Sequence, residues 1–301
     1  MTDMTLDRQH EAAAARSAGR SLRVEVTSAT HRGQVRANNE DAVLAERADS
    51  PVAERRGVLC VVADGMGGHA AGEVASSLAV QTTRQHFYAS REPENGLALR
   101  EAISAANEAV WREAQRSPDR AGMGCTISAA VVRGDEVAVG HVGDSRAYMV
   151  RRADITQITT DHSWVAEQVR AGALTPEQAR QHPRRNVITR AIGQRASVAV
   201  DIYRLHAAAG DAIVLCSDGL SSVVEDDEIG RYARELPPQE AVKRLIDVAN
   251  SRGAPDNVTV AVMRLAVDAV TSAGGRRPGW GLLGLALLLV VIAAYVVLRP
   301  F

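Results

Sequence analysis

Five aspartates lie beside apolar segments in a pattern that could build a metal site. Three of them end an apolar run, a fourth opens one, and a fifth follows Glu40 just before another: Asp64, Asp144, Asp218, Asp256 and Asp41. A single Asp beside Gly is often only a turn residue. Because the ends of sheet strands can converge on one cleft, several such aspartates together indicate a shared pocket.

Carboxylates that share a pocket repel one another and need protons or a cation to be stable together. The segments offer oxygen ligands without Cys or clustered His, which favours Mg²⁺ or Mn²⁺ over Zn²⁺. Two such ions can share a bridging water and lower its pKa, which gives a hydroxide nucleophile at neutral pH. Together with one Arg, the ions would also hold a phosphoryl group.

The sequence around these aspartates resembles the metal-dependent protein phosphatases of the 2C type. The motifs that carry the resemblance are RANNED at 36–41, ADGMGGH at 63–69, GDSR at 143–146, SDGL at 217–220 and DN at 256–257. Each motif alone is weak, but five in the family's order and spacing are specific. The resemblance covers about residues 22–265 and is greatest with the bacterial single-domain branch.

The resemblance implies that two catalytic Mn²⁺ or Mg²⁺ ions are bound, directly or through water, by Asp41, Asp64, Asp218 and Asp256. The backbone carbonyl of Gly65 would be a further ligand, and Glu40 would hold metal-bound water. A third, weaker ion would lie between Asp144 and Asp218. Arg36 would contact the substrate phosphate, because its guanidinium can donate to two phosphate oxygens at once.

One position departs from the family pattern. Some members carry a His directly after the Asp-Gly pair, where it is proposed as the general acid; here that position is Met66. His69 lies three residues further on and is not expected to take over the role, so water or another residue would protonate the leaving group. In TTDHS at 159–163, His162 is interpreted as structural or as an anchor for the flap, and Asp161 as an alternative ligand of the third ion.

Residues 162–193 resemble the mobile flap beside the active site of the family. A TPE triplet at 175–177 has the form of a helix start. Arg184, Arg185 and Arg190 give the flap positive charge. That charge either attracts a phosphopeptide or belongs only to a solvated face.

The elements that would position these residues are mostly strands. Short apolar runs predict buried strands at 57–63, 126–132, 136–143, 147–152, 211–217 and 257–265. Helices are predicted at 72–88, 95–116 and 238–251, and Gly134-Asp135 between two runs predicts a hairpin. A doubly wound parallel sheet needs a helix between successive strands, so the pattern favours an antiparallel α+β domain. The resemblance implies the same class, a four-layer αββα sandwich of antiparallel sheets flanked by helices.

Composition narrows the class of protein further. The chain has 301 residues, of which 46% are apolar and 24% charged, as expected for a packed globular domain. A formal net charge of -1 argues against nucleic acid as the main partner. Cys60, Cys125 and Cys216 lie in or beside apolar runs without a CxxC pair, so we expect them to be buried and unpaired.

The two ends of the chain differ from its centre. Residues 1–20 are polar, lack an apolar signal segment and are expected to be a disordered lead-in to the phosphatase domain at 21–267. After a linker at 268–278, residues 279–298 are expected to form a transmembrane helix, because the 21 residues from Pro278 to Leu298 carry no charge. Arg276 and Arg277 before this segment favour a single-pass membrane protein with a cytoplasmic catalytic domain.

The predicted function is hydrolysis of phosphoserine and phosphothreonine on proteins by a metal-bridging hydroxide. Its partners would be phosphorylated proteins, a Ser/Thr protein kinase that it opposes, and a membrane. Two other functions stay open: a binding or sensor module without turnover, and a phosphatase for small phosphoesters or a single regulator. A module without turnover would be expected to have lost one or more aspartates, and all of them are present.

Overall fold

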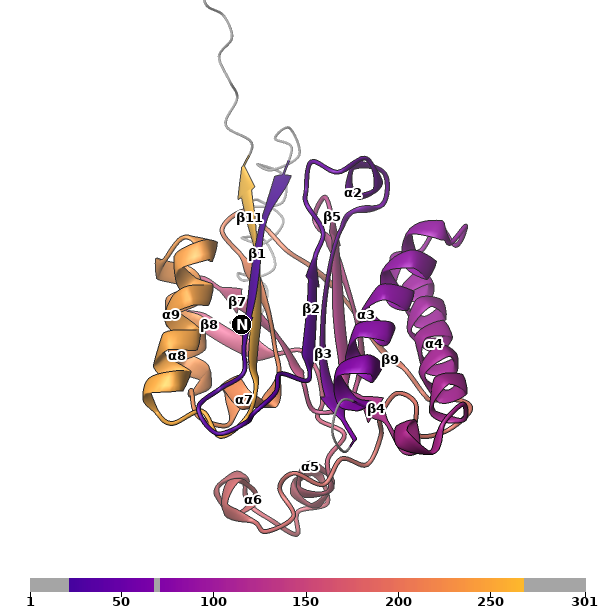
Figure 1. Ribbon diagram of the computed structural model, residues 1–301. Coiled ribbons are helices and arrows are strands. Elements are labelled where there is room, and N and C mark those ends of the chain that lie inside the picture. The colour runs from indigo at the N-terminus through magenta and orange to yellow at the C-terminus, as the bar shows by residue number, and fades with distance from the viewer. Residues whose placement is uncertain (1–21, 68–70, 268–301) are drawn as a thin grey trace, which may run out of the picture. The chain divides into compact units, whose positions relative to one another are not determined.

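Two antiparallel sheets face each other in the part of the chain that this computed structural model describes, residues 22–67 and 71–267 (Figure 1). The first sheet has the strand order β1 (Leu22–His31), β11 (Val258–Val267), β10 (Ala212–Cys216), β7 (Arg146–Arg151), β8 (Asp154–Gln157). The second has the order β2 (Asp41–Ala45), β3 (Val58–Met66), β5 (Ile127–Arg133), β6 (Glu136–Val142), β9 (Asp201–His206), with β4 (Gly124–Cys125) beside β3. Neighbouring strands in both sheets are antiparallel.

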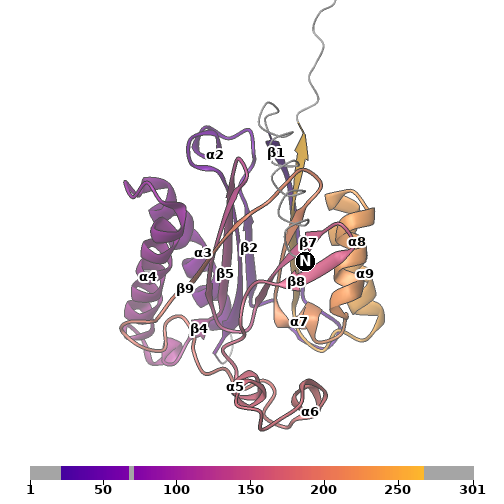
Figure 2. The same cartoon turned by 180° about the vertical axis from the view of Figure 1, so that it is seen from behind.

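Helices cover the outer face of each sheet, as Figures 1 and 2 show from opposite sides. The second sheet is covered by α3 (Ala71–Ala89) and α4 (Asn95–Ala114), and the first by α8 (Asp226–Glu235) and α9 (Pro238–Ser251). The shorter helices are α2 (Pro51–Arg56), η1 (Pro118–Arg120), α5 (Trp164–Arg170), α6 (Pro176–Gln181) and α7 (Asp218–Ser221). The predicted α+β class, with antiparallel sheets flanked by helices, is confirmed.

Strand β3 shows why the sheets form two inner layers. Leu59 and Val61 pack toward α3 and α4, whereas Cys60 and Val62 pack between the sheets against residues such as Ile213 of β10. All four β3 side chains are fully buried. Successive side chains of a strand point to opposite faces, and an inner strand buried on both faces is therefore apolar throughout. A third apolar cluster joins the first sheet to α8 and α9.

Most of the predicted elements are present with shifts of a few residues. The six apolar runs form β3, β5, β6, β7, β10 and β11, and the three predicted helices form α3, α4 and α9. The hairpin at Gly134-Asp135 joins β5 to β6. Strands β1, β2, β4, β8 and β9 were not predicted, and among the shorter helices only the start of α6 was. Cys60, Cys125 and Cys216 are buried and free, as expected.

The predictions for the chain ends concern residues that the structure does not describe. Within residues 22–67 and 71–267, no helix combines the length and the apolar character needed to cross a membrane. The lead-in at 1–20, the linker at 268–278, the transmembrane helix at 279–298 and His69 all lie outside the described residues.

Candidate active site

One end of the two sheets gathers the predicted aspartates. Asp41 opens β2 and pairs in register with Asp64 on β3. On the other sheet, Asp218 follows β10 and Asp256 precedes its neighbour β11. The two sheets meet here directly, because the Ser217 hydroxyl before Asp218 donates to Asp41 Oδ2 over 2.7 Å.

Asp41 is held by hydroxyl groups that the sequence did not single out. Its Oδ2 accepts hydrogen bonds from Thr259 Oγ1 at 2.6 Å and from Ser217 Oγ at 2.7 Å. The pKa of Asp41 is nevertheless raised to about 7, chiefly by burial; the two hydrogen bonds oppose this shift, and the charges of Asp218 and Asp256 add to it. The ionised carboxylate therefore lacks a compensating positive charge.

The pKa values of the neighbouring carboxyl groups are raised as well. Burial, followed by the charges of Asp41 and Asp218, raises the pKa of Asp64 well above its ordinary value. Burial likewise raises the pKa of Asp144 to about 8, with Asp218 adding to the effect. The pKa of Asp218 is also raised, again chiefly by burial. The charge of each carboxylate thus raises the pKa of its neighbours, as expected for acidic groups that lie close together.

Three buried carboxylate oxygens have no hydrogen-bond partner among the described residues: Oδ1 of Asp41, Asp144 and Asp218. Buried acceptors are normally satisfied, and orphaned ones call for an explanation such as an ion. A site made only of oxygen atoms suits a hard cation such as Mg²⁺ or Mn²⁺. The residues present therefore fit a divalent cation, and Asp41, Asp64, Asp144, Asp218 and Asp256 are the ones that would hold it.

In this structure, the predicted ligand side chains are not arranged as a complete metal site. Within the described residues, no three His, Cys, Asp or Glu side chains form a ready-made ion site. Protein groups neutralise part of the charge instead, since Arg36 Nη2 donates to Asp256 Oδ2 over 2.7 Å. Burial lowers the pKa of Arg36, but Asp256 and then Glu40 raise it overall. About half of the Arg36 side chain, 55%, is exposed, so this group is accessible to a ligand from solvent.

Two glycines allow the backbone to close around the carboxylates. A Cβ atom on Gly65 would lie 2.5 Å from the Glu40 carbonyl oxygen, and one on Gly219 would lie 1.9 Å from the Asn257 carbonyl oxygen. Any larger residue would push these segments apart. The Gly65 amide also donates to the Glu40 carbonyl over 3.1 Å, which ties the two predicted ligand segments together.

Asn257 fixes the loop that carries Arg36 and Glu40. Its Oδ1 accepts from the Glu40 amide at 2.8 Å, and its Nδ2 donates to the carbonyl oxygens of Arg32 and Asn38 at 2.9 and 2.8 Å. The DN motif contains this residue, but no role was predicted for it. Ser217 lies in the SDGL motif but, like Thr259, had no predicted role, because hydroxyl residues in or beside strands are common.

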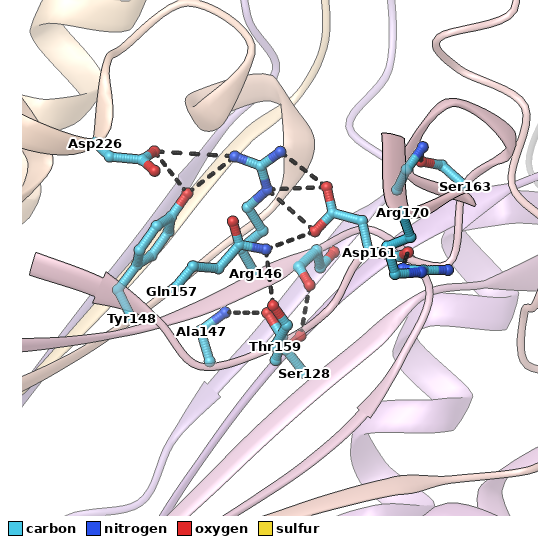
Figure 3. A network of polar contacts seen from close by, with 12 residues as sticks. Ser128, Arg146, Ala147, Tyr148, Gln157, Thr159, Asp161, Ser163, Arg170 and Asp226 are labelled. Carbon is cyan, nitrogen blue, oxygen red and sulfur yellow. Dashed lines mark hydrogen bonds and ion pairs between the residues drawn. The ribbon is translucent and has the colours of Figure 1, made fainter. Parts of the chain in front are cut away.

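Arg146, two residues after Asp144, forms a partly buried ionic network (Figure 3). Its guanidinium donates to both oxygens of Asp161 and, over 3.1 Å, to the hydroxyl of Tyr148. That hydroxyl in turn donates to Asp226 Oδ1 over 3.0 Å. The carboxylate of Asp161, the alternative ligand of a third ion, is therefore already engaged by Arg146 in this structure.

The predicted flap projects from the site end of the sandwich and contains α5 and α6 (Figures 1 and 2). Thr175 caps α6 in a reciprocal pair with Gln178, as the TPE triplet predicted. A cavity of about 590 Å³ lies between the flap and the core, and Asp144, Arg146 and Asp218 line it on the core side.

The positive charge of the flap is distributed unevenly. Arg190 pairs with Asp201 over 2.7 Å, and the Arg184 guanidinium lies 5.3 Å from the ring centroid of Trp164. Arg185 lines the cavity. Of the three arginines predicted to charge the flap, Arg185 is therefore the one placed to meet a ligand in that cavity. Two further flap arginines, Arg170 and Arg180, also line it.

Comparison with known proteins agrees with this arrangement. The family described as Protein phosphatase 2C matches residues 28–259. The serine/threonine protein phosphatase PstP of Mycobacterium tuberculosis is 40% identical over 244 residues, which are 80% of this chain and 45% of PstP. The serine/threonine phosphatase stp of Listeria monocytogenes is 37% identical over 240 residues, 77% of this chain and 92% of that protein.

A solved structure shows the same fold. The crystal structure of the catalytic domain of PstP in complex with two manganese ions superposes with a TM-score of 0.73 at 37% identity, and the match covers 82% of this chain and 100% of that domain. The chain thus spans less than half of full-length PstP but nearly all of its catalytic domain and of the Listeria protein. This chain belongs to the protein phosphatase 2C family.

Proposed function

We propose that this chain is a metal-dependent protein serine/threonine phosphatase that hydrolyses phosphoserine and phosphothreonine on proteins. One observation carries the proposal: carboxylates from two sheets lie close together, and three of their buried oxygens have no partner among the described residues, beside the exposed guanidinium of Arg36. The names of the relatives and the manganese ions of the related crystal structure support it.

The residues divide into those that hold ions and those that hold substrate. Asp41, Asp64, Asp218 and Asp256, with the Gly65 carbonyl and Glu40, would hold two Mn²⁺ or Mg²⁺ ions, and Asp144 with Asp218 a third. When bound, the ions supply charge neutralisation and an activated water for attack on phosphorus. Arg36 would donate two hydrogen bonds to the phosphate oxygens, which orients phosphorus toward that water. Ser217 and Thr259 fix the orientation of Asp41.

Phosphate release from a phosphothreonine peptide tests the proposal. The intact chain is expected to release phosphate with Mn²⁺ or Mg²⁺ and to stop when EDTA removes the ion, and Asp218→Asn is expected to abolish release. Tight Mn²⁺ binding without release would favour a sensor module instead. Release from an aryl phosphate but not from phosphopeptides would favour a small-molecule phosphatase.

We also propose that residues 279–298 anchor the chain in a membrane, with the domain at 21–267 on the cytoplasmic side and the linker at 268–278 between them. The uncharged run from Pro278 to Leu298, with Trp280 and Tyr295 toward its ends, supports this. Deleting residues 276–301 is expected to move the protein from the membrane fraction to the soluble fraction with phosphate release unchanged. Continued sedimentation with membranes would contradict the anchor.

A membrane-held phosphatase would act on phosphorylated proteins near that membrane, including a Ser/Thr protein kinase. Such a kinase, purified in its autophosphorylated form, is expected to lose phosphothreonine when incubated with the chain and Mn²⁺. The Asp218→Asn variant is the matched control, and equal loss with that variant would contradict the assignment.

A further inference from the structure

We propose that His162 is a positioning residue that couples the flap, residues 162–193, to the loop carrying Asp144. This inference rests on the proposed phosphatase function. Each ring nitrogen of His162 serves one side of the coupling: Nδ1 holds the Asp144 loop, and Nε2 holds the flap through Asp201.

His162 forms hydrogen bonds with both backbone groups of Gly143, the residue before Asp144. The His162 amide donates to the Gly143 carbonyl over 2.7 Å, and the Gly143 amide donates to His162 Nδ1 over 3.0 Å. Because Nδ1 accepts a hydrogen bond from a backbone amide, the ring proton of the neutral imidazole belongs on Nε2. The side chain is 5% exposed, so water does not compete for these bonds.

The second ring nitrogen reaches the flap through one carboxylate. His162 Nε2 lies 3.0 Å from Asp201 Oδ2, and Arg190 of the flap donates to Asp201 Oδ1 over 2.7 Å. The Thr189 amide also donates to the His162 carbonyl over 2.8 Å. Thr189 and Arg190 at the end of the flap are thus tied to His162, its first residue.

The Asp144 loop is tightly packed and has little room to move away from His162. Gly143 has a φ of +112°, and a Cβ atom there would lie 2.5 Å from Thr126 Cβ. Thr126 itself exchanges hydrogen bonds with the backbone of Asp64, at 2.8 and 3.1 Å. The loop therefore lies between Thr126 on the metal-site side and His162 on the flap side, and a shift of His162 would move Asp144.

The imidazole ring of His162 also packs against the ring of a second buried histidine, His141. The ring of His141 lies 4.8 Å from the ring of His162, tilted by 32°. His141 Nδ1 is in turn 2.9 Å from Ser128 Oγ, in a fully buried position. This packing holds the His162 ring in the orientation that lets both nitrogens reach their partners.

Two substitutions separate the two sides of the coupling in the full-length chain. His162→Asn keeps an acceptor close to the place of Nδ1 but cannot reach Asp201, whereas His162→Ala loses both contacts. Asp211→Asn is the matched control, because Asp211 is also a buried side chain in an ion pair, with Arg151 at 2.8 Å, at the other end of β10 from Asp218.

Amide hydrogen exchange measures the coupling directly and does not require the protein to turn over a substrate. His162→Ala is expected to speed exchange at Gly143 and at Thr189 about tenfold, and His162→Asn at Thr189 alone. In turnover assays, His162→Ala should raise both the Mn²⁺ concentration for half-maximal rate and the KM for a phosphopeptide about tenfold. His162→Asn should raise only that KM, leaving the KM for an aryl phosphate unchanged.

The outcomes distinguish this inference from the proposed function. Absence of turnover in the unmodified chain would contradict the phosphatase function, while the exchange measurements would still test the coupling. Exchange rates in His162→Ala equal to those in Asp211→Asn would overturn the coupling. So would His162→Asn behaving as His162→Ala at Gly143, since Nδ1 would then have no separate role.

Discussion

Asp41 has one carboxylate oxygen that accepts two hydroxyl hydrogen bonds and another with no partner among the described residues. Hydrogen bonds to an ionised carboxylate favour the charged form, and burial opposes it. With a pKa raised to about 7, burial dominates in the protein without metal. A cation next to the unpartnered oxygen would reverse that balance, with Ser217 and Thr259 fixing the direction in which the oxygen points.

Replacing Thr259 by Val is expected to weaken Mn²⁺ binding by about 10- to 100-fold, the usual effect of removing a group that orients a metal ligand. The substitution keeps the shape of the side chain and removes the donor to Asp41, together with the hydrogen bond between the hydroxyls of Thr259 and Thr30 at 2.7 Å. An Mn²⁺ titration by calorimetry measures the effect. Thr83→Val is the control, because Thr83 is fully buried and its hydroxyl has no partner among the described residues.

Replacing Asp64 by Asn is expected to affect stability and activity in opposite directions. Without metal at pH 8, the neutral amide removes a buried charge that its neighbours repel, so the unfolding temperature should rise. With Mn²⁺, phosphate release should fall by at least about 100-fold. Thermal unfolding in EDTA and a phosphate assay measure the two effects. Lower stability in EDTA would contradict the electrostatic account, and Asp135→Asn in the β5–β6 turn serves as the control.

At the scale of elements, the sequence located the aspartates but not all of the strands that bring them together. Apolar runs such as the one in β3 are distinct because both faces are buried. Strand β9 is half-exposed at a sheet edge and β8 has four residues, so neither forms an apolar run. The meeting of Asp41 with Ser217 depends on how one sheet packs on the other, and no local pattern encodes that.

The helix start predicted in the flap offers a local test. Thr175→Ala removes the cap of α6, at a cost of about 1 kcal/mol. If α6 opens independently of the core, its amides should exchange about fivefold faster, which corresponds to that energy. Ser50→Ala removes the equivalent cap of α2, at the opposite end of the sandwich (Figure 1). That control should leave exchange in α6 unchanged, and an equal effect of both variants would mean that the flap does not open locally.

At the scale of the whole domain, three apolar clusters stabilise a fold that places several acidic groups at one end. The stability of the metal-free protein should therefore depend on pH. The pKa values of Asp41 and Asp144 are raised by burial to about 7 and about 8, above their ordinary value of 3.8. The folded state then holds protons that the unfolded state has released, so the free energy of unfolding must fall as pH rises through that range.

We expect the metal-free protein to lose stability from pH 6.5 to pH 8.5, and Mn²⁺ to stabilise it more at pH 8.5 than at pH 6.5. Burial lowers the pKa values of His141 and His162 below their ordinary value of 6.5. Their unfolded forms still bind protons near pH 6.5, so these groups oppose the trend at the lower end of the window only. Thermal unfolding in EDTA and in saturating Mn²⁺ measures both trends. Stability in EDTA that rises with pH would contradict the raised pKa values.

The most direct test of the central claim is a crystal structure determined with Mn²⁺, using the anomalous signal of the ion. The account predicts two manganese ions in the pocket, with oxygen atoms of Asp41, Asp64, Asp218 and Asp256 bound directly at about 2.0–2.6 Å or through water. No anomalous density there at saturating Mn²⁺, or manganese only at sites that these carboxylates do not touch, would contradict it.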